Sequence, residues 1–110
     1  MRLFSIVITA ALLSMPLLAS ELICQTKVNL ELTAKQQVTI ASSESVRFAA
    51  DRDYTFILKR KNSNSYCLEI FSPSREVRHY SCSTLHQPGE FLEWVIWSRE
   101  EMVEAICTLL

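Results

Sequence analysis

Apolar and polar residues alternate along most of this chain, and the two-residue period constrains the fold more than any other feature of the sequence. The first run carries Cys24, Thr26, Val28, Leu30 and Leu32 on one side of the alternation. Further runs follow at residues 37–40, 46–50, 54–58, 66–71, 77–82 and 91–97. Because successive side chains of a strand point to opposite faces, each run predicts a strand with at least one buried face.

Short polar segments separate the runs and predict turns at residues 51–53, 62–65, 72–76 and 87–90. The last of these, Gln87-Pro88-Gly89-Glu90, fits a type II turn with Pro and Gly at its central positions. Gly89 is the only glycine, so any other turn position with a positive φ is expected to be Asn, Asp or Ser. The spacing predicts a mainly β fold, a small antiparallel meander that forms either a barrel or a sandwich.

The last segment, residues 98–110, fits two structures. Ser98-Arg99-Glu100-Glu101 matches a helix capping box, and Met102, Ile106 and Leu109 would then form the apolar stripe of a short C-terminal helix. In a strand, Val103, Ala105, Cys107 and Leu109 share one face, and residues 98–101 become a hairpin turn. We favour the strand, because Cys24 also lies on an apolar face and the two cysteines could meet across neighbouring strands.

The four cysteines, Cys24, Cys67, Cys82 and Cys107, predict two disulfides in a short exported chain. If Ser72 pairs with Val77 across the turn at 72–76, Cys67 lies directly opposite Cys82, at a distance that a disulfide can bridge. We therefore predict Cys67–Cys82 and, by elimination, Cys24–Cys107. The cysteines are far apart along the chain, whereas zinc ligands occur in closely spaced pairs, so we expect no metal.

Residues 1–20 have the features of a signal peptide. Arg2 supplies the positive charge, residues 3–13 are apolar apart from Ser5 and Thr9, and small residues follow at Ala19 and Ser20. We expect cleavage there, one disulfide-tied domain at 21–110, and a periplasmic or secreted location. An uncleaved anchor is less favoured, because Pro16 interrupts a run already shorter than the roughly 20 residues of a transmembrane helix. A lipoprotein is less favoured because Glu21-Leu22-Ile23 precedes the first cysteine.

Composition excludes several functions. The chain has 11 basic and 12 acidic residues; without Arg2, the mature chain has a net charge of about −2, which argues against a nucleic-acid partner. A single glycine excludes glycine-rich phosphate loops, and neither Gly-x-Ser-x-Gly nor His-Glu-x-x-His occurs. We expect no enzyme, no catalytic residue and no cofactor. A small hydrolase that uses His79 or His86 is the least favoured hypothesis.

Two groups of residues are candidates for binding. Residues 91–97 are apolar on both faces, so Trp94 and Trp97 belong either to the core or to a surface that meets a partner. The basic cluster of Lys59, Arg60 and Lys61 is either a site for an anionic surface or a solvated hairpin end. Glu69 is expected to be an exposed cross-strand partner of Tyr80.

The leading hypothesis is a non-enzymatic binding or inhibitory module outside the cytoplasm, with a protein or an envelope polymer as its partner. It rests on the architecture, since small disulfide-tied β domains offer a rigid surface with little ordering cost on binding. The alternative is a structural or accessory component of the cell envelope.

Overall fold

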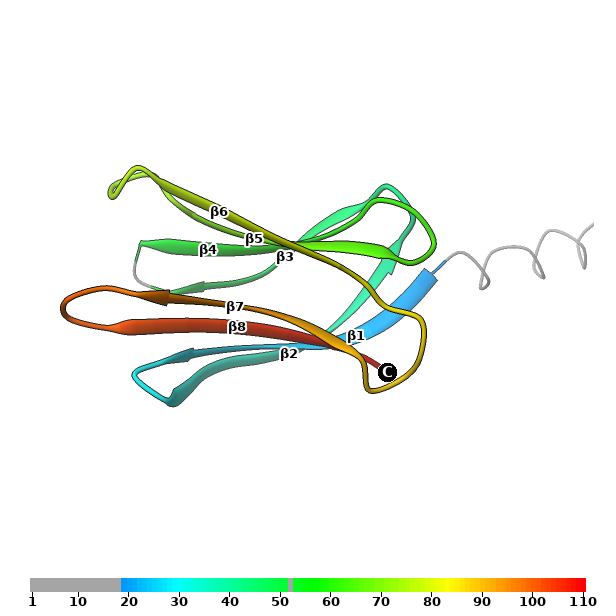
Figure 1. Cartoon of the computed structure of the whole chain (residues 1–110), viewed down its shortest axis with the longest axis horizontal. Coiled ribbons are helices and arrows are strands. Elements are labelled where there is room, and N and C mark those ends of the chain that lie inside the picture. The colour runs from blue at the N-terminus through cyan, green and yellow to red at the C-terminus, as the bar shows by residue number, and fades with distance from the viewer. Residues whose placement is uncertain (1–18, 52) are drawn as a thin grey trace, which may run out of the picture.

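The chain folds as a β-sandwich of two four-stranded antiparallel sheets, as the computed structural model shows for residues 19–51 and 53–110 (Figure 1). The described residues form eight strands, which are β1 (Ala19–Val28), β2 (Glu31–Ala41), β3 (Ser45–Asp51), β4 (Tyr54–Arg60), β5 (Ser65–Ser72), β6 (Val77–Thr84), β7 (Phe91–Trp97) and β8 (Met102–Leu109). The mainly β prediction is confirmed, and the architecture is the sandwich rather than the barrel. Apart from Ala19 and Ser20, the predicted signal peptide lies outside the described residues. The described part has no helix that could span a membrane.

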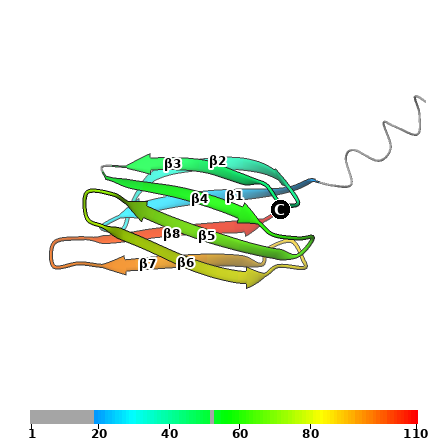
Figure 2. The same ribbon diagram turned by 90° about the horizontal axis from the view of Figure 1, so that it is seen from above.

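Each sheet has four strands, but only sheet B takes its strands from one continuous part of the chain. Sheet A has the order β2-β1-β8-β7 and sheet B the order β3-β4-β5-β6. The β1–β2 hairpin begins sheet A, a four-stranded meander makes all of sheet B, and the β7–β8 hairpin returns to sheet A (Figure 2). The turns of three hairpins, at residues 29–30, 73–76 and 98–101, lie at the same end of the sandwich (Figure 1).

The last segment is a strand, and the helix alternative is wrong. β8 pairs with β1 on one side and with β7 on the other, so its backbone groups are bonded to two neighbouring strands rather than within the segment. Residues 98–101 form the hairpin turn, in which the amide of Ser98 donates to the carbonyl of Glu101 at 2.8 Å.

Both predicted disulfides are confirmed. Cys24 lies opposite Cys107 in the β1–β8 ladder, and Cys67 lies opposite Cys82 in the β5–β6 ladder. The predicted β5–β6 register, which begins at Ser72 opposite Val77, is also confirmed. The two disulfides differ in position, because Cys24 and Cys107 face the core of the sandwich, whereas the Cys67–Cys82 bridge lies on the outer face of sheet B.

The core lies between the two sheets and is built from alternate residues of the strands. Each sheet turns its apolar set inward, as the alternating buried and less buried positions of β1, β4 and β8 show. The largest fully buried apolar side chains are Tyr66, Phe56, Leu22, Ile40, Leu58, Leu68, Ile70 and Leu92.

The first alternating run does not form one strand, contrary to the sequence prediction. β1 ends at Val28, which pairs with Glu31 across a two-residue turn of Asn29 and Leu30. Both turn residues have positive φ, 50° and 71°, as in a type I′ hairpin. Leu30 and Leu32 are consequently 72% and 55% exposed rather than buried. The alternation continues through the reversal, so the period alone could not locate it.

The expectation for positive-φ residues is correct in part. Asn29 and Ser43 (φ 69°) follow it, and Gly89 has φ 94° with the amide of Glu90 donating to the carbonyl of Gln87, as the predicted type II turn requires. It is wrong for Leu30 and for Glu76 (φ 52°). Leu30 and Glu76 lack the short polar side chain that lets Asn adopt this region more easily, so each carries about 1–2 kcal/mol of backbone strain.

Candidate binding surfaces

The two tryptophans of β7 lie on opposite faces of sheet A. Trp94 points inward, where its ring lies 5.4 Å from the ring of His79 on β6; its buried Nε1 has no hydrogen-bond partner among the described residues. Trp97 points outward and is 76% exposed. The two candidates therefore do not share a surface, and Trp97 is the one available to a partner.

Trp97 is one of several apolar residues at the hairpin end of sheet A. We define the hairpin-end patch as Leu30, Leu32, Met102 and Trp97. Trp97 pairs with Met102 across β7 and β8. Asn29 fastens the β1–β2 turn to Met102 with two hydrogen bonds, one from its own amide (2.9 Å) and one accepted by its side-chain oxygen (3.0 Å). These two hydrogen bonds join the ends of the two hairpins.

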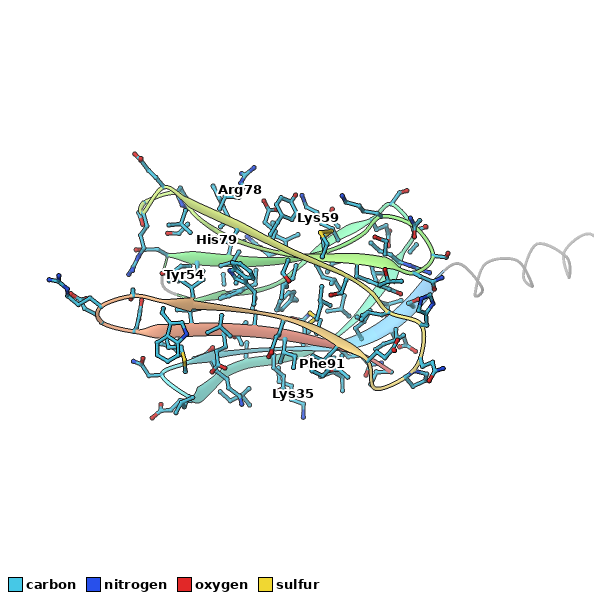
Figure 3. All side chains as sticks on the ribbon, viewed as in Figure 1. Lys35, Tyr54, Lys59, Arg78, His79 and Phe91 are labelled. Atoms are coloured by element: carbon cyan, nitrogen blue, oxygen red, sulfur yellow. A yellow bond between two sulfur atoms is a disulfide. The ribbon has the colours of Figure 1, made fainter. Side chains whose placement is uncertain are left out.

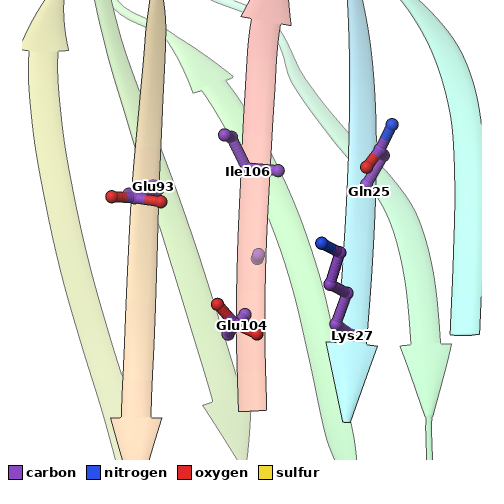
Figure 4. Close-up of a pocket in the computed structure, with 6 residues that line it drawn as sticks. Gln25, Lys27, Glu93, Glu104 and Ile106 are labelled. Carbon is purple, nitrogen blue, oxygen red and sulfur yellow. The ribbon is translucent and has the colours of Figure 1, made fainter. Parts of the chain in front are cut away.

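Beside this patch, the outer face of sheet A is polar and slightly hollowed. A depression of about 80 Å³ is lined by Gln25, Lys27, Glu93, Glu104, Ala105 and Ile106 (Figure 4). Glu104 lies opposite Lys27 in the β1–β8 ladder. Pockets that enclose small molecules usually measure about 300–1,000 Å³. The depression is much smaller than such pockets, and most of the side chains that line it are polar.

The predicted basic cluster is divided among three environments. Lys59 projects from the outer face of sheet B (Figure 3), and Lys61 is exposed in the β4–β5 turn. Arg60 is only 7% exposed. Its guanidinium donates to the backbone carbonyls of Ile40 (3.1 Å), Asn62 (3.2 Å) and Ser63 (2.9 Å). Arg60 thus connects β2 to the β4–β5 turn, and the three residues do not form one surface.

Glu69 is buried, contrary to the expectation of an exposed residue. It lies opposite Tyr80 as predicted, but it is only 3% exposed. Its carboxylate sits between Lys59 and Arg78, with both N–O distances 3.2 Å, and both cations project from this outer face in Figure 3. Sequence analysis missed this ion cluster because the register between β4 and β5, which places Lys59 diagonal to Glu69, was not predicted.

Aromatic rings cover the same cations. The Lys59 ammonium lies 5.0 Å from the ring centre of Tyr80, and the Arg78 guanidinium lies 4.7 Å from that of Phe71. Lys59 also donates a hydrogen bond to the Tyr80 hydroxyl. Because each positive charge already has a carboxylate and a ring as partners, this cluster mainly ties β4, β5 and β6 together.

We expect the stabilising contribution of Lys59 to disappear at high pH. The hydrogen bond to Tyr80, and then the contacts with Glu69, raise the pKa of Lys59 above its ordinary value of 10.5. A group whose pKa is higher in the folded state stabilises fully below the unfolded pKa and loses that effect as pH rises through the folded pKa. The difference in unfolding free energy between wild type and Lys59→Met should therefore be constant from pH 7 to about 10 and shrink above it.

Urea titrations at a series of pH values measure this difference, and Lys35→Met, on the exposed outer face of β2 (Figure 3), is the control. NMR titration of the Lys59 side chain gives a second measurement, in which Tyr80→Phe should lower the pKa of Lys59. An unchanged pKa in Tyr80→Phe would show that the hydroxyl does not hold the proton on Lys59.

The two histidines lie in different places. His79 points toward the space between the sheets (Figure 3), against Trp94. His86 is exposed in the β6–β7 connection, where its amide and that of Gln87 donate to the Glu90 carboxylate at 2.6 and 3.0 Å. These two amides hold the pKa of Glu90 below its ordinary value. His86 thus contributes its backbone to a capped turn.

Among the described residues, no three His, Cys, Asp or Glu side chains come close enough together to hold a metal ion. The hairpin-end patch, with its polar neighbours, remains the surface best suited to meet another molecule. Comparisons of the chain with models of known protein families, with curated proteins and with solved structures found no match.

Proposed function

We propose that this is an exported, non-enzymatic binding protein that docks on a partner protein through the hairpin-end patch. The observation that carries the proposal is the exposure of Trp97 (76%) and Leu30 (72%) at the joined ends of two hairpins. The two disulfides are consistent with a location outside the cytoplasm, and the features of residues 1–20 favour export.

The chemistry of the patch suits a protein partner. Tryptophan is among the residues that contribute most to protein interfaces, because a large ring is desolvated at little conformational cost. Lys27, Glu104 and Gln25 lie beside the patch and can supply the polar rim of an interface. The turn beyond Trp97 is held by Arg75, whose guanidinium lies 3.4 Å from the carboxylate of Glu101. A surface that is already ordered loses little entropy on binding.

Leu30 gives the proposal its sharpest test. A glycine would relieve the strain of its positive φ, so Leu30→Gly should increase the free energy of unfolding by about 1 kcal/mol. The same change removes an exposed side chain of the patch and should weaken binding. The matched control is Glu76→Gly, which relieves the same kind of strain at the end of the β5–β6 hairpin and leaves the patch intact.

The measurement compares wild type, Leu30→Gly and Glu76→Gly as immobilised proteins exposed to the exported proteins of the cells that make this chain. We expect wild type and Glu76→Gly to retain the same protein. Leu30→Gly should retain much less of it, although Leu30→Gly should be more stable than wild type. Equal retention by all three, or no retained protein, contradicts the proposal. No retained protein would favour a structural role in the envelope.

A further inference from the structure

β7 is the least protected of the four strands at the sheet edges. The edge strands are β2 and β7 in sheet A and β3 and β6 in sheet B. Irregular register interrupts β2 and β3, and β2, β3 and β6 carry Lys35, Arg47 and Arg78. β7 pairs with β8 without a register shift, and its sequence, FLEWVIW, contains no Lys, Arg or Pro. Proteins commonly protect edges with such charges, prolines and bulges, so the open edge of β7 is available for pairing.

The ladder with β8 determines which backbone groups face this edge. The amide of Leu109 donates to the carbonyl of Glu90, and the amide of Ser98 donates to that of Glu101. Because hydrogen-bonded positions alternate along an antiparallel ladder, residues 90, 92, 94, 96 and 98 bond to β8. Phe91, Glu93, Val95 and Trp97 therefore direct their N–H and C=O groups away from β8, to the edge.

We propose that β7 pairs antiparallel with β7 of a second copy of this chain, about a two-fold axis at Trp94. This register places Phe91 opposite Trp97 of the second copy and Glu93 opposite Val95 of the second copy, and the symmetry repeats both pairs. Each pair joins two residues with free edge groups and exchanges two N–H···O=C bonds. The two copies of sheet A become one continuous sheet, and the dimer is closed because pairing occupies the edge of β7 on both copies.

Side chains favour this register over its neighbours. Moving one strand by two residues in one direction places Glu93 opposite Glu93 of the second copy, where like charges repel. Moving it in the other direction places Trp97 opposite Glu93 and leaves Phe91 without a partner. With the axis at Trp94, both aromatic pairs form, and no carboxylates face each other directly.

The exposed surface available for burial also favours a second copy. Phe91 and Trp97 are 51% and 76% exposed and project from the outer face of sheet A, as Figure 3 shows for Phe91. A fully buried aromatic side chain removes about 150–250 Å² from water, so the exposed parts of the four rings in two copies bring several hundred Å² of aromatic surface to the contact. Together with the backbone edges, this approaches the roughly 1,200 Å² of the smaller stable interfaces. The pairing shares Trp97 with the hairpin-end patch, but Leu30 and Leu32 lie outside the contact, so Leu30→Gly, which tests the proposed function, should leave the dimer unchanged.

Sedimentation of the purified protein over the micromolar to millimolar range tests the pairing. We expect a monomer–dimer equilibrium for wild type. Phe91→Lys and Trp97→Glu each remove both aromatic pairs of the symmetric dimer, so each should raise the dissociation constant by about tenfold or more. Mixing the two variants should restore dimers, because one Lys–Glu pair and one wild-type Phe–Trp pair form in each heterodimer.

Tyr80→Lys and Tyr80→Glu are the controls, since Tyr80 is an exposed aromatic residue of β6 and lies outside the contact. They should dimerise as wild type does. In a mixture of labelled and unlabelled wild type, an intermolecular NOE should join Phe91 and Trp97. A monomeric wild type, larger open assemblies, an equal effect of the Tyr80 variants, or failure of the mixed variants to associate would each overturn the proposal.

Discussion

Replacing Cys24 and Cys107 together by alanine should lower the free energy of unfolding by about 4–5 kcal/mol, whereas replacing Cys67 and Cys82 should lower it by about 3 kcal/mol. The first disulfide joins residues 83 positions apart and the second joins residues 15 apart. A cross-link that closes a longer loop removes more conformational freedom from the unfolded chain. The first pair therefore matters more, although both bridges connect directly opposed strand residues.

The location of the Cys24–Cys107 bridge increases the difference between the two losses of stability. Both of its residues are fully buried between the sheets, so alanine leaves unfilled space in the core as well. For a domain whose total stability is typically about 5–15 kcal/mol, this loss can unfold a large fraction of the molecules. Urea unfolding of wild type and both double variants measures the effect. An equal loss of stability in the two double variants, or a greater loss on replacing Cys67 and Cys82, would show that loop length does not determine which disulfide stabilises the fold more.

Arg60→Ala should lower the free energy of unfolding by about 3 kcal/mol. The change leaves the carbonyls of Ile40, Asn62 and Ser63 without the guanidinium that now donates to them, and Arg60 is 7% exposed, so water does not fully replace the lost bonds. Hydrogen bonds to charged groups contribute about 1.5–3 kcal/mol each, and their sum is reduced by the cost of burying the charge.

Lys61→Ala is the matched control for Arg60, because it removes a neighbouring positive charge from an exposed turn and should change stability by no more than about 0.5 kcal/mol. Thermal and urea unfolding of the two variants make the comparison. If Arg60→Ala is as stable as Lys61→Ala, the carbonyl contacts do not hold β2 to the β4–β5 turn, and Arg60 returns to the set of candidate binding residues.

Local pattern was sufficient to predict several parts of the structure. The period of two predicted strands, and the turn at residues 72–76 fixed the β5–β6 register, because a short hairpin allows few alignments. That register placed Cys67 opposite Cys82 and left Cys24 for Cys107. The type II turn at Gly89 also followed from local residue preferences. Each of these features depends on residues that are near one another in the chain.

The hairpin-end patch was only partly predictable. Trp97 was a candidate because β7 is apolar on both faces, but the sequence could not show which face packs on sheet B. Leu30 and Leu32 were expected in the core, since the alternation passes unbroken through the turn at Asn29. Glu69 was expected at the surface, although Lys59 and Arg78 neutralise it in a buried position.

The sequence by itself determined that the chain forms strands, where most of them begin and end, and which cysteines pair. Only the tertiary structure decided that the strands form two sheets rather than a barrel, that β1 and β8 are the central strands of sheet A, and that β7 is left at an edge. The physical reason is that a strand's period records how many of its faces are buried. The period carries no information on which distant strand pairs with it, or on which sheet packs against its buried face.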